Sequence, residues 1–155
     1  MDVTGIFYRY KSDIKDNKIF DPIRKKYVHC TPEEIIRQKT IKFLIKRLEI
    51  PKNKIIVECS LNTLGVNGSK KRIDIGILDN NNLIMGVIEC KAFLIDELAY
   101  LQAQGYLSEL KTRYFFVTNG QIFDGYYYDA IQFIKLEGDI PKYNDLCNID
   151  INKGG

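Results

Sequence analysis

Three segments rich in isoleucine and valine follow one another in the middle of the chain, and they constrain the fold more than any other feature. They span residues 54–61, 72–78 and 83–92. Segments rich in β-branched residues and bounded by Gly, Asn and Asp are typical of strands, so three consecutive strands are predicted. The link at 79–82 reads Asp-Asn-Asn-Asn, and asparagine tolerates the left-handed conformations of tight turns. The second and third strands are therefore expected to form a hairpin.

Helical patterns flank these strands. Thr31 is a candidate N-cap, Pro32 suits the first helical position, and Glu34 stands at the spacing of a capping box, so a helix is expected from here to about Leu48. A second helix is expected next, then further strands, over residues 96–110, 114–117, 122–128 and 131–136. The order helix, three strands, helix, strand predicts an α/β fold with a mixed central sheet flanked by helices.

The chain has 155 residues, of which 45% are hydrophobic and 28% charged, as in an ordinary globular domain. A single domain is predicted, with an N-terminal arm (1–30), a core (31–136) and a polar tail (137–155). A chain of this length can bury roughly 70% of its unfolded surface, so folding needs neither a metal nor disulfides. Any metal would serve chemistry.

Several classes of protein are disfavoured. The four cysteines form no C-x-x-C pair and there is one histidine, His29, which argues against a structural zinc site. No charged and apolar leader opens the sequence and no apolar run approaches the ~20 residues of a membrane span, so a cytoplasmic protein without membrane contact is expected. The net charge of +3 permits contact with a polyanion without demanding it.

Charged residues interrupt two of the predicted strands. Glu89 and Lys91 stand two apart in an apolar strand, which places both on one face. Burying a charge costs several kcal/mol unless it is paired or binds a cation. If the 79–82 loop joins Leu78 to Leu83, Asp74 lies opposite Val87, diagonal to Glu89 and on the same face.

This arrangement suits a divalent cation. Carboxylate oxygens favour Mg²⁺ or Mn²⁺, and a metal beside a lysine suits phosphodiester hydrolysis, in which Lys91 would orient water or stabilise developing charge. A structural ion pair of Lys91 with Asp74 or Glu89 explains the same pattern equally well. Residue spacing alone leaves both interpretations open.

A resemblance favours the first one. Between residues 24 and 130 the chain resembles the amino-terminal domain of type I restriction enzyme R subunits, a branch of the PD-(D/E)XK nucleases. Five landmarks in order carry the resemblance: Thr31-Pro32-Glu33-Glu34 with Arg37-Gln38, Lys71-Arg72-Ile73-Asp74, Val87-Ile88-Glu89-Cys90-Lys91-Ala92, Gln102-Ala103-Gln104-Gly105-Tyr106, and Thr118-Asn119-Gly120.

The resemblance implies a restriction-endonuclease-like core and a role for each matched residue. Asp74 and Glu89 would bind Mg²⁺ or Mn²⁺, and Lys91 would be the catalytic lysine. Gln102 and Tyr106 would form the Q-x-x-x-Y element, which supports the site or contacts DNA. Spacing agrees, because residues i and i+4 share one helix face. Tyr106 also fits a plain core position.

Two further assignments have ordinary alternatives. Glu34 corresponds to the helix acid that often completes such sites, but an acid at this spacing also caps a helix unaided. Lys70, Lys71 and Arg72 enter the Asp74 strand and would contact DNA phosphates, or would form a solvated loop end. Ile73 replaces the proline of the PD motif.

The resemblance also implies partners: double-stranded DNA, a motor domain in the same or another chain, and the methyltransferase and specificity subunits of a restriction complex. This sequence carries no G-x-x-x-x-G-K-[ST] motif of its own. Three functions follow for comparison. They are a Mg²⁺-dependent endonuclease domain of a type I R subunit, a non-catalytic DNA-binding or docking module, and a stand-alone nuclease of branched or damaged DNA.

Overall fold

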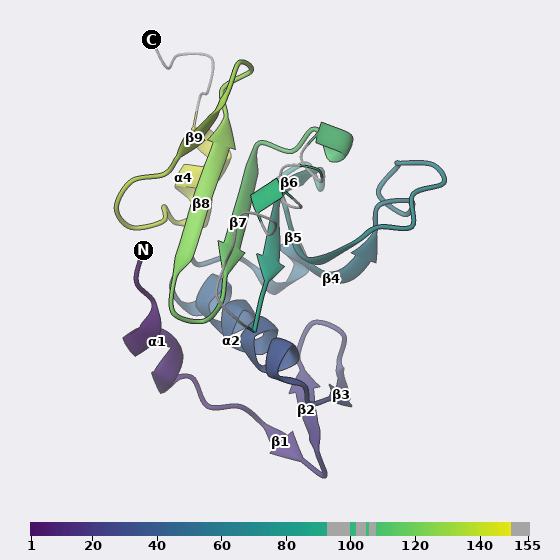
Figure 1. The fold of residues 1–155 in the computed structure, drawn as a ribbon, viewed down its shortest axis with the longest axis vertical. Helices are drawn as coiled ribbons and strands as arrows, with labels where there is room; N and C mark the ends of the chain where they lie inside the picture. The colour runs from purple at the N-terminus through teal and green to yellow at the C-terminus, as the bar shows by residue number, and fades with distance from the viewer. Residues whose placement is uncertain (93–99, 102–104, 106–107, 150–155) are drawn as a thin grey trace.

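A six-stranded mixed sheet forms the centre of the computed structural model, which describes residues 1–92, 100, 101, 105 and 108–149. Its strands lie in sequence order from one edge to the other (Figure 1): β4 (Ile55–Ser60), β5 (Arg72–Leu78), β6 (Ile84–Cys90), β7 (Tyr114–Thr118), β8 (Phe123–Tyr128) and β9 (Phe133–Lys135). Only β6 and β7 run parallel among these neighbours. The predicted α/β fold with a mixed sheet is confirmed.

Parallel neighbours require a crossover connection, usually a helix. The helix predicted over 96–110 occupies the link between β6 and β7, and most of it lies outside the described residues. Within the described part of the chain, no helix combines the length and apolar character needed to cross a membrane.

The N-terminal arm is a helix followed by a small antiparallel sheet: α1 (Thr4–Arg9), β1 (Ile14–Lys15), β2 (Lys18–Asp21) and β3 (Lys26–His29). The backbone N–H of Val3 donates to the carbonyl of Gln121 at 2.8 Å, which ties the start of the chain to the turn between β7 and β8. Phe7 packs against Phe43. The arm is therefore folded onto the body.

Helix α2 (Pro32–Lys46) begins as its sequence predicts. Thr31 is the N-cap, and its Oγ1 accepts the backbone N–H of Glu34 at 3.0 Å. A short 3-10 helix, η1 (Lys52–Lys54), then leads into β4. Helix α2 lies against the sheet (Figure 1) and buries Ile41 and Leu44, so its N-terminus is fixed above the strands that carry the charged residues.

Two apolar clusters cover the sheet. The first includes α1, α2 and residues of every strand from β4 to β8, and the second contains Leu61, Ile73, Val87, Phe115 and Val117. The segment after Leu136 is polar in sequence, yet it adds helix α4 (Tyr143–Asn148) to the first cluster. Tyr143 is buried there and its hydroxyl donates to the carbonyl of Leu78 at 2.8 Å.

The predicted register of the β5–β6 hairpin is wrong by two residues. Val87 lies opposite Gly76, not opposite Asp74, and the ladder shifts between Ile77 and Leu78. One residue of the difference comes from a longer turn, since Leu78 pairs with Ile84 where Leu83 was expected, and the irregularity between Ile77 and Leu78 adds the second. Continuing the observed pairing by one step from Ile75 and Ile88 places Asp74 directly across from Glu89.

The strands also change faces beside Asp74. Ile75 and its partner Val57 pack in the first cluster, whereas Ile73 and its partner Cys59 pack in the second. In a regular strand residues two apart share a face, so the alternation is interrupted between these pairs. Glu58, at the interruption in β4, has a φ of 52°. The regular alternation assumed from the sequence is therefore wrong here.

A glycine in β5 leaves no room for a side chain. A Cβ on Gly76 would lie 2.7 Å from Cγ1 of Ile56 and 2.8 Å from Cδ1 of both Ile73 and Ile84. We expect Gly76→Ala to lower the free energy of unfolding by about 1–3 kcal/mol, as overpacking does. Urea titration measures this. Gly5→Ala is the control because a Cβ there meets nothing within 4 Å, and equal stability of the two variants would contradict the account.

Candidate catalytic and metal-binding site

Asp74 is held on both of its carboxylate oxygens. Oδ2 accepts the backbone N–H of Cys90 at 2.8 Å, and Oδ1 accepts from Nη2 of Arg37 at 3.2 Å. The first contact comes from the adjacent strand β6 and the second from helix α2. The carboxylate is thus fixed at the place where the sheet and the N-terminal half of α2 meet.

Glu89 and Lys91 lie beside Asp74 at the end of β6. The ammonium of Lys91 is 3.5 Å from Oε1 of Glu89. Glu89 is buried, with 7% of its surface exposed. Burial, with the negative charge of Asp74 added to it, raises the pKa of Glu89 to about 8, although Lys91 opposes the change. The three predicted residues are therefore brought together.

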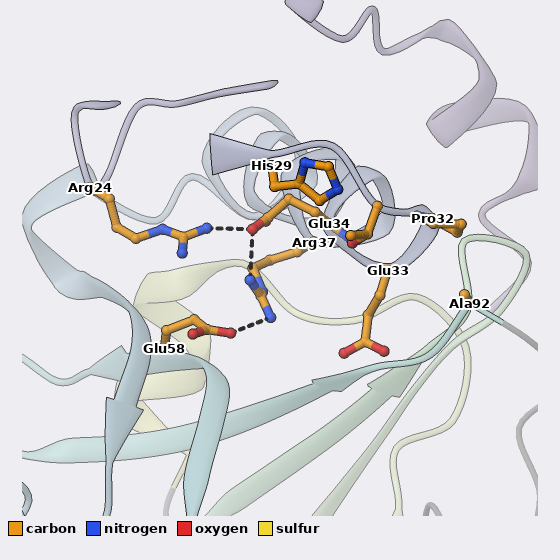
Figure 2. Close-up of a pocket in the computed structure, with 9 residues that line it drawn as sticks. Arg24, His29, Pro32, Glu33, Glu34, Arg37, Glu58 and Ala92 are labelled. Carbon is orange, nitrogen blue, oxygen red and sulfur yellow. Dashed lines mark hydrogen bonds and ion pairs between the residues drawn. The ribbon is translucent and has the colours of Figure 1, made fainter. Parts of the chain in front are cut away.

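Glu34 faces a different set of partners. Its Oε1 accepts from Nη2 of Arg24 at 2.6 Å and from Nη1 of Arg37 at 2.9 Å (Figure 2). Its Oε2 accepts from Gln38 at 3.3 Å. Two guanidinium groups thus bind a carboxylate that is itself buried. Its side chain joins the arm to α2, in addition to the N-cap bond made by its backbone.

The neighbouring acid Glu33 points toward the sheet instead, as Figure 2 shows. Partial burial and the negative charge of Asp74 raise the pKa of Glu33, while Lys91 lowers it. Glu89 experiences the charge of Glu33 in turn. Glu33 is therefore the acid of α2 that is electrostatically coupled to the Asp74 and Glu89 pair. Which of the two adjacent acids faces the sheet depends on how α2 is rotated about its axis, and the sequence does not show this.

Glu58 is a further acid of the site that sequence reasoning missed. Its Oε1 accepts from Nη2 of Arg37 at 2.8 Å, beside the contact to Asp74. Continuing the β4–β5 ladder places Glu58 across from Asp74, so three acids occupy neighbouring positions on β4, β5 and β6. An acid among β-branched residues in Ile55–Ser60 was the available signal, the same one that identified Asp74.

The donor chemistry fits a hard divalent cation. Asp74, Glu89 and Glu33 offer only carboxylate oxygens, and their mutual repulsion is what a cation would relieve. Across the described residues, no group of three or more acidic, histidine or cysteine side chains is already close enough to hold a metal ion. Asp74 and Glu89 are the pair best placed as ligands, and Glu33 is a further carboxylate that is electrostatically coupled to both.

A cavity of about 550 Å³ opens beside these residues. Its walls come from the arm, the start of α2, strand β4 and the residue after Lys91: Arg24, His29, Thr31, Pro32, Glu33, Glu34, Arg37, Glu58 and Ala92 (Figure 2). His29, to which the sequence assigned no role, is one of these lining residues. Asp74, Glu89 and Lys91 are not among the lining residues, so the cavity adjoins the candidate site through Glu33, Arg37 and Glu58.

The remaining predicted residues divide into two groups. Lys70, Lys71 and Arg72 are exposed where the chain enters β5. Two of them have acidic partners: Lys71 is 2.6 Å from Glu109, and Arg72 is 3.6 Å from Glu58. Gln102 and Tyr106 lie outside the described residues.

The chain matches a known protein family. Residues 32–137 match the family model described as the type I restriction enzyme R protein N terminus. The chain belongs to this family. Comparison with curated proteins gave no significant match. The predicted resemblance to R subunits is therefore confirmed, and with it a place in a restriction system.

The residues that match the family include most of the candidate site but not all of it. Asp74, Glu89, Lys91 and Glu33 all fall within the R-protein segment, whereas Arg24 precedes it. A residue of the arm therefore completes the charge network of a family member whose shared part begins at Pro32.

Proposed function

We propose that this R-protein domain is a metal-dependent endonuclease that hydrolyses phosphodiester bonds of double-stranded DNA. The observation that carries the proposal is the meeting of Asp74, Glu89 and Lys91 at one end of β5 and β6. A cation would relieve the repulsion between the clustered carboxylates, and Mg²⁺ or Mn²⁺ suits oxygen ligands.

In this proposal each residue has a separate task. Asp74 and Glu89 would hold the cation, and Glu33 would add a further negative charge beside it. When bound, the cation would polarise the phosphoryl oxygen and lower the pKa of water. Lys91 would orient the attacking water or stabilise the charge that develops on the phosphate. Lys70 and its two neighbours would contact DNA phosphates outside the cleaved bond.

The partners follow from the family. Type I R proteins imply a restriction complex, so the motor domain would lie in the same or another chain, with methyltransferase and specificity subunits supplying sequence recognition. A stand-alone nuclease of branched or damaged DNA would use the same three residues without those partners.

One observation favours a second candidate, a non-catalytic DNA-binding or docking module. Asp74 is already bound by Arg37 and by the N–H of Cys90, so its charge is partly compensated without any cation. A chain that had lost turnover would keep this ion pair. Under that proposal the chain binds DNA without cleaving it.

Metal binding separates the two candidates. We expect the chain to bind Mn²⁺, and Asp74→Asn to weaken binding by at least about 100-fold, beyond the roughly 10- to 100-fold typical of groups outside the ligand set. Asparagine keeps the shape and can still accept the Cys90 N–H, so the variant should remain folded. Isothermal titration with Mn²⁺, together with circular dichroism, measures both effects.

Asp139→Ala provides the control, because it removes the same charge from an exposed residue whose nearest partner, Arg47, is 3.8 Å away. Its Mn²⁺ affinity should equal that of the unmodified chain. Equal binding by the unmodified chain and Asp74→Asn, with both folded, would eliminate the metal site and leave the docking module.

A further inference from the structure

One guanidinium group binds three acids of the site. Nη1 of Arg37 lies 2.9 Å from Glu34, and Nη2 lies 2.8 Å from Glu58 and 3.2 Å from Asp74. Only 7% of the Arg37 side chain is exposed, and within the described part of the structure its Nε is the one buried side-chain nitrogen or oxygen without a hydrogen-bond partner. Leaving the Nε donor unpaired costs free energy. The contacts that Nη1 and Nη2 make with the three acids offset this cost.

A second arginine fixes the first from outside the shared family segment. Nη2 of Arg24 lies 2.6 Å from Oε1 of Glu34, the same oxygen that Arg37 contacts. Arg24 is in turn held by Asp21, whose Oδ2 accepts from its Nε at 2.5 Å, and Asp21 is fully buried. The contacts therefore run without a break from the arm to Asp74: Asp21, Arg24, Glu34, Arg37, Asp74.

We propose that Arg37 is a positioning residue that orients Asp74 for the cation, and that the arm holds Arg37 in place through Arg24 and Glu34. This inference rests on the proposed function, since it concerns the geometry of the proposed ligand. The planar fork of arginine makes two or more directed bonds at once, which a lysine cannot reproduce. Partners that orient a metal ligand are commonly worth 10- to 100-fold in metal affinity.

Charge and orientation predict opposite effects of removing an arginine. A positive charge near a cation site repels the cation, so deleting Arg24 should strengthen Mn²⁺ binding if charge alone mattered. Orientation predicts weaker binding. Arg37→Lys keeps the charge and removes the fork, so a loss of affinity in that variant is not an effect of net charge.

The experiment measures Mn²⁺ dissociation constants of the full chain by isothermal titration. We expect Arg37→Lys to weaken binding 10- to 100-fold and Arg24→Gln to weaken it several-fold. The double variant should bind no more weakly than Arg37→Lys alone, because Arg24 acts through Arg37. Arg47→Gln is the control for charge, since Arg47 is exposed at the other end of α2.

Folding is checked by circular dichroism on each variant. Should Arg37→Lys unfold, Arg24→Gln decides alone, because Arg24 is the more exposed of the two. Unchanged or tighter Mn²⁺ binding by the folded variants would overturn the positioning role. If Asp74→Asn still weakens binding by at least about 100-fold in that case, the proposed function survives. If the unmodified chain binds no Mn²⁺, both proposals fail together.

A second measurement compares the loss of the positioning residue with the loss of a ligand. In Arg37→Lys the ligands remain, so raising the Mn²⁺ concentration 10- to 100-fold should restore the fraction of chain with metal bound, followed by electron paramagnetic resonance. In Asp74→Asn the same increase should fail to do so. Equal behaviour of the two variants would refute the assignment.

Discussion

Replacing Lys91 with alanine should reduce DNA cleavage by about 10²- to 10³-fold or more, the loss typical of removing one group that stabilises transition-state charge. Mn²⁺ binding should remain or become tighter, because the variant removes a positive charge 3.5 Å from Glu89. Plasmid cleavage in the presence of Mg²⁺ measures the first effect, with the chain alone and within its restriction complex. Titration measures the second.

Lys52→Ala is the matched control for this experiment. Lys52 is exposed in the short 3-10 helix η1, away from the end of β6, and the substitution changes the net charge equally. It should cut DNA at the normal rate. A Lys91→Ala variant that cuts as fast as the control would end the catalytic assignment, whereas reduced cleavage together with lost Mn²⁺ binding would give Lys91 a structural role instead.

Replacing Glu89 with glutamine should make the metal-free chain more stable while removing its metal site. Burial raises the pKa of Glu89 from 4.5 to about 8, with the charge of Asp74 adding to it. Between these values the folded chain binds a proton that the unfolded chain does not, so stability falls as pH rises through this window. Glutamine carries no charge to bury.

At pH 8 we expect a stability gain of up to about 5 kcal/mol, since one pKa unit corresponds to about 1.4 kcal/mol and the pKa rises from 4.5 to about 8. Urea unfolding at pH 5 and pH 8 measures it, and the pH dependence should be smaller in the variant. Mn²⁺ affinity should fall at least about 100-fold, as for any lost ligand. Glu137→Gln, at an exposed position, should alter neither property. A destabilised Glu89→Gln chain at pH 8 would show that the carboxylate is compensated without a cation.

The order of helices and strands could be predicted because each element carries its own local signal. Thr31 and Pro32 mark the start of α2, and its N-cap bond is present. The isoleucine-rich segments became β4, β5 and β6. Such signals depend on neighbours within a few positions, which is what a single sequence displays.

The contribution of α4 could not be predicted in this way. Its segment is short and polar, and the two residues that anchor it, Tyr143 and Leu146, are separated by polar neighbours. They become buried because they pack into the first apolar cluster. Helix formation in short segments depends on such tertiary packing more than on intrinsic propensity.

The candidate site shows the same distinction between what the sequence determines and what tertiary packing determines. The sequence by itself determined that Asp74, Glu89 and Lys91 would interrupt apolar strands, because a charge among isoleucines needs a partner wherever the strands lie. It also determined the family, through motifs kept in order. Only the tertiary structure decided how these charges meet: a shifted register beside the turn, a change of face at Glu58, and the rotation that turns Glu33 to the sheet. The Arg37 contacts to Glu58 in β4 and Asp74 in β5 were likewise beyond the sequence. The physical reason is that hydrogen bonds and ion pairs about 3 Å long depend on where whole helices and strands lie. Their placement results from packing of the entire core.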